Sequence, residues 1–166
     1  MSVIGARRSA GMPLVLFVFR VLLGVLFLSV WGSNLDKGLY DNGPYAALIR
    51  GYVENGDAPA VWKDVMTFVA DNAAVFSKLQ LVGELGLGVL LVVGFATRLV
   101  GVAAGLFLGV LWLSEIGVPN EWIWSLVFPT LGAFAVALLS AGRVLGLDAV
   151  LLGRPPLDRL PPWATG

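Results

Sequence analysis

Cysteine and histidine are both missing from the 166 residues, and charged side chains are scarce, at 13% of the chain. Without cysteine there can be no disulfide, thiol redox chemistry, thiolate-held zinc or iron–sulfur cluster. Without histidine, haem is not expected, and acid–base chemistry falls to carboxyl groups, lysine or tyrosine. No carboxylates are clustered for a metal ion. The 11 basic and 11 acidic residues cancel, so no nucleic-acid partner is expected.

Hydrophobic residues are what the chain has in excess, at 58%. An ordinary soluble domain is about 45–50% apolar and about 25% charged. A soluble chain of this length has too little interior to bury so much apolar surface. The composition therefore predicts an all-α integral membrane protein.

The longest apolar stretch, 79–113, contains only two ionisable residues, one of which is Arg98. A bilayer core about 30 Å thick needs roughly 20 helical residues, so this stretch suits two crossings. A charge is far less costly at the membrane surface than in the bilayer centre, so we place the turn at Thr97–Arg98, close to Gly94. The result is a predicted transmembrane hairpin with spans at 79–97 and 99–114.

Two further apolar segments, 12–31 and 122–142, complete a predicted bundle of four transmembrane helices. Pro13 suits the first turn of the first helix, and Pro129 should kink the last one. A cleaved signal peptide is the competing interpretation of the first segment, but the apolar run is too long and no A-x-A site follows it. We treat 1–166 as one domain that ends in a cytoplasmic tail, 143–166.

The region 32–77 is the only sizeable polar part of the sequence. Its apolar residues recur at helical spacing on both sides of the turn at 55–57, which predicts two short amphipathic outer helices between the first two spans. Their expected apolar faces are Tyr45, Leu48, Ile49, Tyr52 and Val53 in the first, and Val61, Trp62, Val65, Phe68 and Val69 in the second. We interpret Tyr40, Tyr45 and Tyr52 as interfacial anchors.

Loop charges predict the orientation. Four crossings place both termini on one side, and by the positive-inside rule the arginine-rich side is cytoplasmic. Its arginines are Arg7, Arg8, Arg98, Arg143, Arg154 and Arg159. The region 32–77 then faces outward, and an aromatic belt of Trp31, Trp112, Trp122 and Trp124 lies at the outer interface.

Small residues recur every four positions in the third and fourth spans. This spacing lets membrane helices approach closely, so it predicts that these two spans pack together. The residues are Gly101, Gly105 and Gly109 in the third span and Ala133, Ala137 and Ala141 in the fourth.

Arg20 and Glu84 are ionisable residues inside predicted spans, which makes them the first functional candidates. At 1.5 Å per residue, Arg20 lies about 12 Å from the cytoplasmic end of its helix and Glu84 about 9 Å from the outer end of its own, so a direct salt bridge is doubtful. Arg20 either binds a ligand, snorkels to the interface or holds carbonyl groups of a neighbouring helix. Glu84 is either a proton-exchanging acid beside a quinone or polar substrate, or a neutral, hydrogen-bonded acid.

The outer segment also supplies basic side chains that could meet an anionic substrate. They are Lys37, Arg50, Lys63 and Lys78. Charges on a wet helix face are usually only solvated, and this interpretation is favoured for Lys63 and Lys78.

Three groups of residues carry a family resemblance. They are Arg20-Val21-Leu22-Leu23-Gly24; Gly83-Glu84-Leu85-Gly86-Leu87-Gly88 leading to Gly94-Phe95-Ala96-Thr97-Arg98; and Ala141-Gly142-Arg143 leading to Gly146-Leu147-Asp148. Together, in this order, they resemble the DoxX family, and more specifically its DoxD branch, the membrane subunit of thiosulfate:quinone oxidoreductase. The first resembles the family's arginine-bearing helix, the second its glutamate-to-arginine helix and the third its closing signature.

The resemblance implies a four-helix bundle in the cytoplasmic membrane of a bacterium or archaeon, with other membrane-complex subunits, lipid, a quinone and a small sulfur anion as partners. Carried over by position, it marks Glu84 and Arg20 as catalytic candidates and Arg98, Arg143 and Asp148 as cofactor-binding candidates. We add Trp31, at the outer end of the first span, to the cofactor-binding set. Two alternatives stay open: a non-catalytic accessory subunit of a larger complex, and a small-molecule carrier, which the lack of an inverted repeat disfavours.

Overall fold

The computed structural model describes residues 11–122, 124–139, 141–143 and 145–151. This part of the chain is all-helical, as predicted, and contains no strand. Its elements are α1 (Gly11–Asp36), α2 (Asn42–Asn55), α3 (Ala60–Asp71), α4 (Ala73–Val93), α5 (Thr97–Glu115), α6 (Trp124–Leu138), the 3₁₀ turn η1 (Ala141–Arg143) and α7 (Leu147–Leu151). Most of the predicted tail, together with Arg7 and Arg8, lies outside the described residues.

In the described part of the chain, three helices are long and apolar enough to cross a bilayer: α1 from Leu14 onward, α4 and α5. These helices and the composition identify a membrane protein. α6 has 15 residues, which is about 22 Å at 1.5 Å per residue, so it is shorter than the predicted span 122–142. The chain leaves the α-helix after Leu138 and enters η1 soon afterwards.

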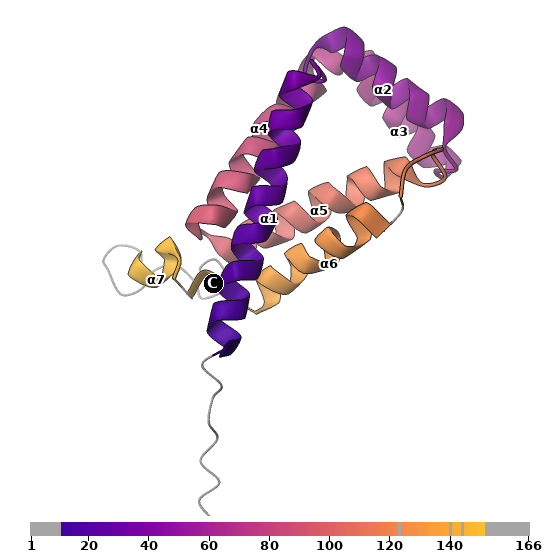
Figure 1. Cartoon of the computed structure of the whole chain (residues 1–166). Helices are drawn as coiled ribbons and strands as arrows, with labels where there is room; N and C mark the ends of the chain where they lie inside the picture. The colour runs from indigo at the N-terminus through magenta and orange to yellow at the C-terminus, as the bar shows by residue number, and fades with distance from the viewer. Residues whose placement is uncertain (1–10, 123, 140, 144, 152–166) are drawn as a thin grey trace, which may run out of the picture.

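The helices pack as three pairs, α1 with α4, α5 with α6, and the shorter α2 with α3 (Figure 1). The two long pairs meet near the α4–α5 turn and spread apart toward their other ends. The α2–α3 pair bridges those ends, so the three pairs outline a triangle. The predicted hairpin of the second and third spans, α4 and α5, is therefore open. The two helices diverge from their turn, and each packs mainly on another helix.

The turn between α4 and α5 lies at 94–96, so the predicted position, Thr97–Arg98, is wrong and falls in the first turn of α5. Gly94 ends α4 with φ +73°, a left-handed conformation that glycine adopts without strain. α4 also begins at Ala73 instead of 79, and α1 continues to Asp36 instead of ending at 31. Glu84 consequently lies eleven residues into α4, about 16 Å along the axis, near the middle of the helix.

Glycines set the closest approaches between the paired helices. A Cβ atom on Gly24 of α1 would lie 2.8 Å from the carbonyl oxygen of Gly88 in α4. Between α5 and α6, a Cβ atom on Gly101 would lie 2.9 Å from the carbonyl oxygen of Ala133 and 3.0 Å from the Cβ atom of Ala137. The packing predicted from the small residues of these two spans is confirmed.

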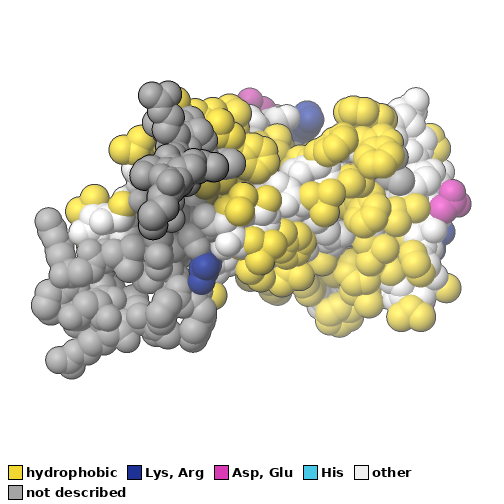
Figure 2. Space-filling model, turned by 90° about the horizontal axis from the view of Figure 1, so that it is seen from below, with side chains coloured by type: hydrophobic (Ala, Val, Ile, Leu, Met, Phe, Trp, Pro, Cys, Tyr) yellow, Lys and Arg dark blue, Asp and Glu magenta, His cyan; other side chains and the backbone are white. Residues whose placement is uncertain are grey.

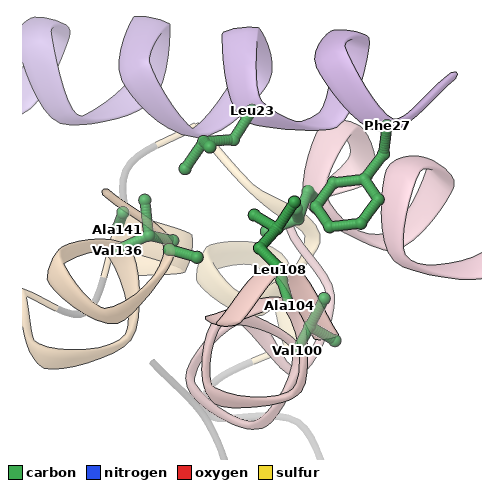
Figure 3. Packing of buried hydrophobic residues seen from close by; sticks show 9 residues of the cluster. Leu23, Phe27, Val100, Ala104, Leu108, Val136 and Ala141 are labelled. Carbon is green, nitrogen blue, oxygen red and sulfur yellow. The ribbon is translucent and has the colours of Figure 1, made fainter. Parts of the chain in front are cut away.

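An apolar core joins the two long pairs where they approach each other (Figure 3). Leu23 and Phe27 of α1 face Ala104 and Leu108 of α5, and Val136 comes from α6. Each of the five is no more than 5% exposed. In lipid, such packing is stabilised by van der Waals contact and not by exclusion from water.

Large apolar side chains also cover the outside of the long helices. On the face that Figure 2 shows, hydrophobic side chains cover much of the described part, with few charged ones among them. Leu79, Leu106 and Leu131, on α4, α5 and α6, are each about 60% exposed. A soluble monomer rarely exposes so much apolar surface, whereas lipid chains would cover it.

The α2–α3 pair has a small core of its own. The side chains buried in it include Tyr45, Ile49, Met66 and Ala70. The apolar face predicted for α3 is partly wrong, because Val61 and Phe68 are 78% and 59% exposed while Met66 and Ala70 are turned inward. Tyr45 is buried, so the interfacial-anchor interpretation is wrong for this residue.

The loop between α2 and α3 is attached to the loop between α5 and α6. The backbone N–H of Asp57 donates to the carbonyl oxygen of Ile116 at 2.6 Å, and a Cβ atom on Gly56 would lie 3.0 Å from the same oxygen. Gly117 adopts φ +74°, which lets the chain turn directly beneath Asp57. This contact closes the far corner of the triangle.

Candidate functional site

Glu84 is 1% exposed, and its carboxyl group accepts hydrogen bonds from three side chains. Gln80, one turn earlier in α4, donates through Nε2 at 2.8 Å. Asn34, in the last turns of α1, donates through Nδ2 at 3.1 Å, and Tyr40, in the α1–α2 turn, donates through its hydroxyl. We call these four residues the carboxyl site. Leaving a buried acceptor without such donors costs about 1–3 kcal/mol, so the donors are what lets an acid lie in an apolar helix.

Tyr40 is held by hydrogen bonds at both its backbone and its side chain. Its carbonyl oxygen accepts a hydrogen bond from Lys78 Nζ at 2.9 Å, and its side chain is 3% exposed. Burial, reinforced by the hydrogen bond to Glu84, raises the pKa of Tyr40 above its ordinary value, so the hydroxyl keeps its proton and acts as a donor. The interpretation of Tyr40 as an interfacial anchor, and of Lys78 as merely solvated, is therefore wrong.

A cavity of about 450 Å³ opens beside the carboxyl site, between the spread helix pairs and against α2. We call it the polar cavity. Its polar lining residues are Asn34, Lys37, Tyr52, Gln80, Glu84, Glu115, Glu121 and Ser125, and its apolar walls include Phe27, Phe107 and Leu108. Its volume falls within the range of small-molecule sites, about 300–1,000 Å³.

Tyr52 lies in this cavity with its hydroxyl against Glu115. Burial, followed by the negative charges of Glu115 and Glu121, raises the pKa of Tyr52. The neutral phenol lines the same cavity as Glu115, Glu121 and the carboxyl group of Glu84. This arrangement places groups that can exchange protons along one cavity.

A second space of about 410 Å³, the apolar pocket, lies on the α3 and α4 side of the same helices. Its walls are mostly aliphatic and aromatic, and among them Trp62 donates a hydrogen bond to Ser114 Oγ at 3.0 Å. The residues that line both the apolar pocket and the polar cavity are Ile49, Tyr52, Gln80, Phe107 and Leu111. Gln80 thus touches the apolar pocket while it donates to Glu84.

Arg20 is completely buried near the α4–α5 turn, far from the α2–α3 pair. Its Nη2 atom donates to the carbonyl oxygen of Leu145 at 3.3 Å, and its guanidinium carbon lies 5.5 Å from the centre of the Phe17 ring. Gly94 makes room for it, because a Cβ atom there would lie 1.5 Å from Nη1. Among the described residues, the Nε and Nη1 atoms of Arg20 have no hydrogen-bond partner. Arg20 therefore holds a carbonyl of a neighbouring segment instead of snorkelling to the interface.

Asp148, in the first turn of α7, caps the N-terminus of α5. Its Oδ1 and Oδ2 atoms accept hydrogen bonds from the backbone N–H groups of Ala96 and Thr97 at 2.8 and 2.9 Å. Its own N–H donates to the carbonyl oxygen of Gly94 at 2.9 Å. A carboxylate is favoured at this end of a helix by the dipole, and the Arg20 charge adds to the attraction. We call Arg20, Gly94, Leu145 and Asp148 the arginine cluster.

The structure thus divides the predicted site residues between two places. Glu84 belongs to the carboxyl site, whereas Arg20 and Asp148 belong to the arginine cluster. No hydrogen bond joins Arg20 to Glu84 among the described residues, in agreement with the doubt about their pairing. The segments that carry the family resemblance also meet here, since Gly94, Ala96 and Thr97 contact Asp148 or Arg20.

The remaining predicted residues lie around these two places. Arg98 is in the first turn of α5, beside the arginine cluster, and Arg143 is in η1, with its side chain outside the described part of the structure. The carbonyl oxygen of Trp31 lies 3.4 Å from the Tyr40 hydroxyl, but its ring lines neither cavity. Arg50 forms an ion pair with Asp71 at 2.8 Å on the exposed surface of the α2–α3 pair.

Sequence reasoning missed the donors of the carboxyl site. Gln80 had a usable signal, because it precedes Glu84 by four residues and so shares its helix face. Asn34 and Tyr40 lie 50 and 44 residues away in sequence, and no local pattern brings them to Glu84. Comparisons with known protein families, with curated proteins and with solved structures find no match to this chain.

Proposed function

We propose that this chain is a membrane subunit of a quinone-linked oxidoreductase, of the DoxX family and closest to its DoxD branch. The observation that carries the proposal is a buried acid, Glu84, that lines the polar cavity and is held by three donors, one of which, Gln80, also lines the apolar pocket. A quinone needs this combination, since its ring and tail are apolar while its reduction consumes protons.

The apolar pocket suits the quinone ring. Its volume of about 410 Å³ and its aromatic walls suit a flat hydrophobic ligand. Gln80 and Tyr52 lie on the wall that faces the polar cavity, where they would face the quinone carbonyl oxygens. A lipid-soluble ligand would reach the pocket from the bilayer between the apolar surfaces of α3, α4 and α5.

The reaction adds two electrons and two protons to the quinone and gives a quinol. In this proposal the electrons come from a small sulfur anion such as thiosulfate, oxidised at another subunit, and Glu84 passes protons toward the quinone through its hydrogen-bonded neighbours. Glu84 regains them from water. A positioned acid of this kind contributes about 10²–10⁴-fold to a rate.

The proposed membrane arrangement has four crossings, with α6 as the fourth. The antiparallel packing of α6 along α5 supports it, because α6 must then traverse most of the depth that α5 traverses. The α2–α3 pair lies at the outer surface of a prokaryotic cytoplasmic membrane, and both termini lie in the cytoplasm. This orientation rests on the positive-inside rule.

The test uses the complex purified in mild detergent with its co-purifying subunits. Bound quinone is extracted, and thiosulfate-dependent quinone reduction is measured for wild type, Glu84→Gln and the exposed control Glu54→Gln. We expect Glu84→Gln to lower the turnover by about 10²-fold or more, the scale of a lost acid catalyst, and Glu54→Gln to leave it unchanged. Unchanged turnover in Glu84→Gln, with bound quinone retained, would refute the catalytic proposal.

An accessory role is the second candidate. It is favoured by the exposed apolar face of α3, where Val61 and Phe68 are 78% and 59% exposed beyond the long helices. In an accessory subunit, Val61→Ser with Phe68→Ser would dissociate the partner subunits, and Glu84→Gln would leave the activity of the intact complex unchanged. The identity of the co-purifying subunits separates the two roles most directly.

A further inference from the structure

The polar cavity has one open end and one closed end. Glu121 and Ser125, at its mouth, are exposed, whereas Glu84, at its inner wall, is 1% exposed. The mouth lies on the side of the α2–α3 pair, because Glu115 ends α5 and Glu121 precedes α6 there. The cavity of about 450 Å³ has room for several waters, at about 30 Å³ each in the liquid.

The opposite end of the cavity adjoins the apolar core of Figure 3, because Phe27 and Leu108 belong both to that core and to the cavity lining. Along α5, Leu108 lines the cavity while Ala104, one turn further, is 0% exposed and lies in that core. Along α4, Leu91 lies between Glu84 and the arginine cluster and is also 0% exposed. Between α1 and α4, the backbones approach closely at Gly24 and Gly88, where even an added Cβ atom would lie 2.8 Å from a carbonyl oxygen.

We propose that the polar cavity is a one-sided water route by which Glu84 exchanges protons only with the aqueous phase on the α2–α3 side. This proposal rests on the proposed function for what the protons are used for. The access of water to Glu84 from one side does not depend on whether a quinone binds. Proton uptake by the acid is then vectorial, since the apolar core separates Glu84 from the phase beside the arginine cluster.

Several charged and titratable groups face this route. Lys37 contributes from the α1–α2 turn, Tyr52 from α2, Glu115 from α5 and Glu121 from the α5–α6 loop. Tyr52 and Glu115 are in hydrogen-bond contact, which places a neutral phenol and a carboxyl group next to each other in the passage. Ser125 adds a hydroxyl group from α6. Carboxyl groups and hydroxyls along a hydrated passage are the groups that relay protons to a buried acid.

The first experiment maps water access with single cysteines, which need no cysteine-free background because the native chain has none. A membrane-impermeant, charged thiol reagent is added to right-side-out and to inverted membrane vesicles from expressing cells. Glu54→Cys marks the α2–α3 side and Phe95→Cys marks the α4–α5 turn. The test positions are Ser125→Cys at the mouth and Leu108→Cys at the inner wall, and Ala104→Cys is the matched control one turn deeper in α5.

We expect Ser125→Cys and Leu108→Cys to react only in the vesicles in which Glu54→Cys reacts, and Ala104→Cys to react in neither. The reagent attacks the thiolate, which forms readily only in contact with water. Reaction of Leu108→Cys from the Phe95→Cys side, or reaction of Ala104→Cys at the same rate as Leu108→Cys, would overturn the one-sided route. Failure of Leu108→Cys to react from either side would overturn it as well.

The second experiment follows the proton on the native acid. A hydrophobic carbodiimide crosses membranes and modifies a protonated carboxyl group, so peptide mass spectrometry of modified Glu84 reports its protonation; Glu84→Gln is the blank. Raising the bath pH should suppress the modification where the bath contacts the α2–α3 side and leave it unchanged in the other vesicles. Equal suppression in both would refute the route, whereas loss of quinone reduction alone would refute only the proposed function.

Discussion

At the scale of single residues, Glu84 shows how an acid is kept inside an apolar helix, since Tyr40, Asn34 and Gln80 all donate to it. Tyr40→Phe removes the donor with the least exposed side chain and leaves its shape unchanged. We expect a loss of about 1–3 kcal/mol in the free energy of unfolding, because a hydrogen bond to a buried carboxyl is removed. Thermal unfolding in detergent measures it, and Tyr45→Phe, whose ring is equally buried but makes no hydrogen bond in the described structure, should change little.

The three tyrosines, Tyr40, Tyr45 and Tyr52, also limit the stability of the fold at alkaline pH. Burial raises the pKa of all three in the folded state, so above pH about 10 the unfolded chain loses these protons while the folded chain keeps them. Stability that is fully present below that pH is then lost as the pH rises. The melting temperature in detergent should fall above pH about 10, and the double variant Tyr40→Phe with Tyr52→Phe should flatten that fall. An equally steep fall in the double variant would contradict the assignment.

Gly94 supports the arginine cluster by lacking a side chain. Gly94→Ala combines a φ of +73° with a Cβ atom 1.5 Å from Arg20 Nη1, so the buried guanidinium must move. The free energy of unfolding should drop by more than about 1 kcal/mol. Gly86→Ala in the same helix is the matched control: nothing lies within 4 Å of its added Cβ atom, and it should be neutral or slightly stabilising.

The sequence identifies Arg20, Glu84 and Asp148 as unusual. It does not predict that Glu84 lies in one site while Arg20 and Asp148 lie in another. An ionisable residue in an apolar segment is visible from composition alone. Its partners are not, because the contact between Glu84 and Tyr40 depends on how the α1–α2 turn folds back onto α4. The cap that Asp148 forms on α5 likewise joins residues 51 apart.

At the scale of helices, apolar length and glycine positions predict the elements well. α1, α4 and α5 follow from runs of apolar residues, and α2 and α3 follow from periodic apolar faces around a turn. The ends are less predictable, because they depend on local conformation as well as on charge. Arg98 marks the vicinity of the α4–α5 turn, but Gly94, in its left-handed conformation, and the Asp148 cap decide where the helices stop.

The α5–α6 seam permits a matched test of helix packing. Gly101→Val places a branched side chain 2.9 Å from the carbonyl oxygen of Ala133, where backbone cannot yield easily. We expect a loss of about 1–3 kcal/mol, typical of overpacking. Gly109→Ala, two turns along the same face, meets only Thr130 Cγ2 at an ordinary 3.7 Å and should be tolerated. Melting temperatures of the two variants in one detergent compare them, and equal losses would count against the seam as the determinant.

At the scale of the whole molecule, the spreading of the two long pairs decides whether there is a site at all. A regular bundle with α4 packed along α5 would leave no room beside Glu84. The polar cavity exists because those arms diverge and because the α2–α3 pair braces them, through the contact of Asp57 with Ile116. Such divergence is set by contacts between distant segments, which explains why apolar periodicity predicts the helices but not the triangle.

The number of crossings is the whole-molecule property on which the one-sided route depends. Fifteen residues of α6 cover about 22 Å, less than a bilayer core of about 30 Å, but α6 packs along α5, and in the proposed arrangement it enters the membrane with that helix. The described chain continues through η1 and α7 to the arginine cluster, near the N-terminal half of α1. A reporter fused after the last residue should therefore lie on the same side as one fused before the first, as measured by compartment-specific activity. Reporters on opposite sides would mean that only three helices cross the membrane. The segment that contains α6 would then begin and end on the same side.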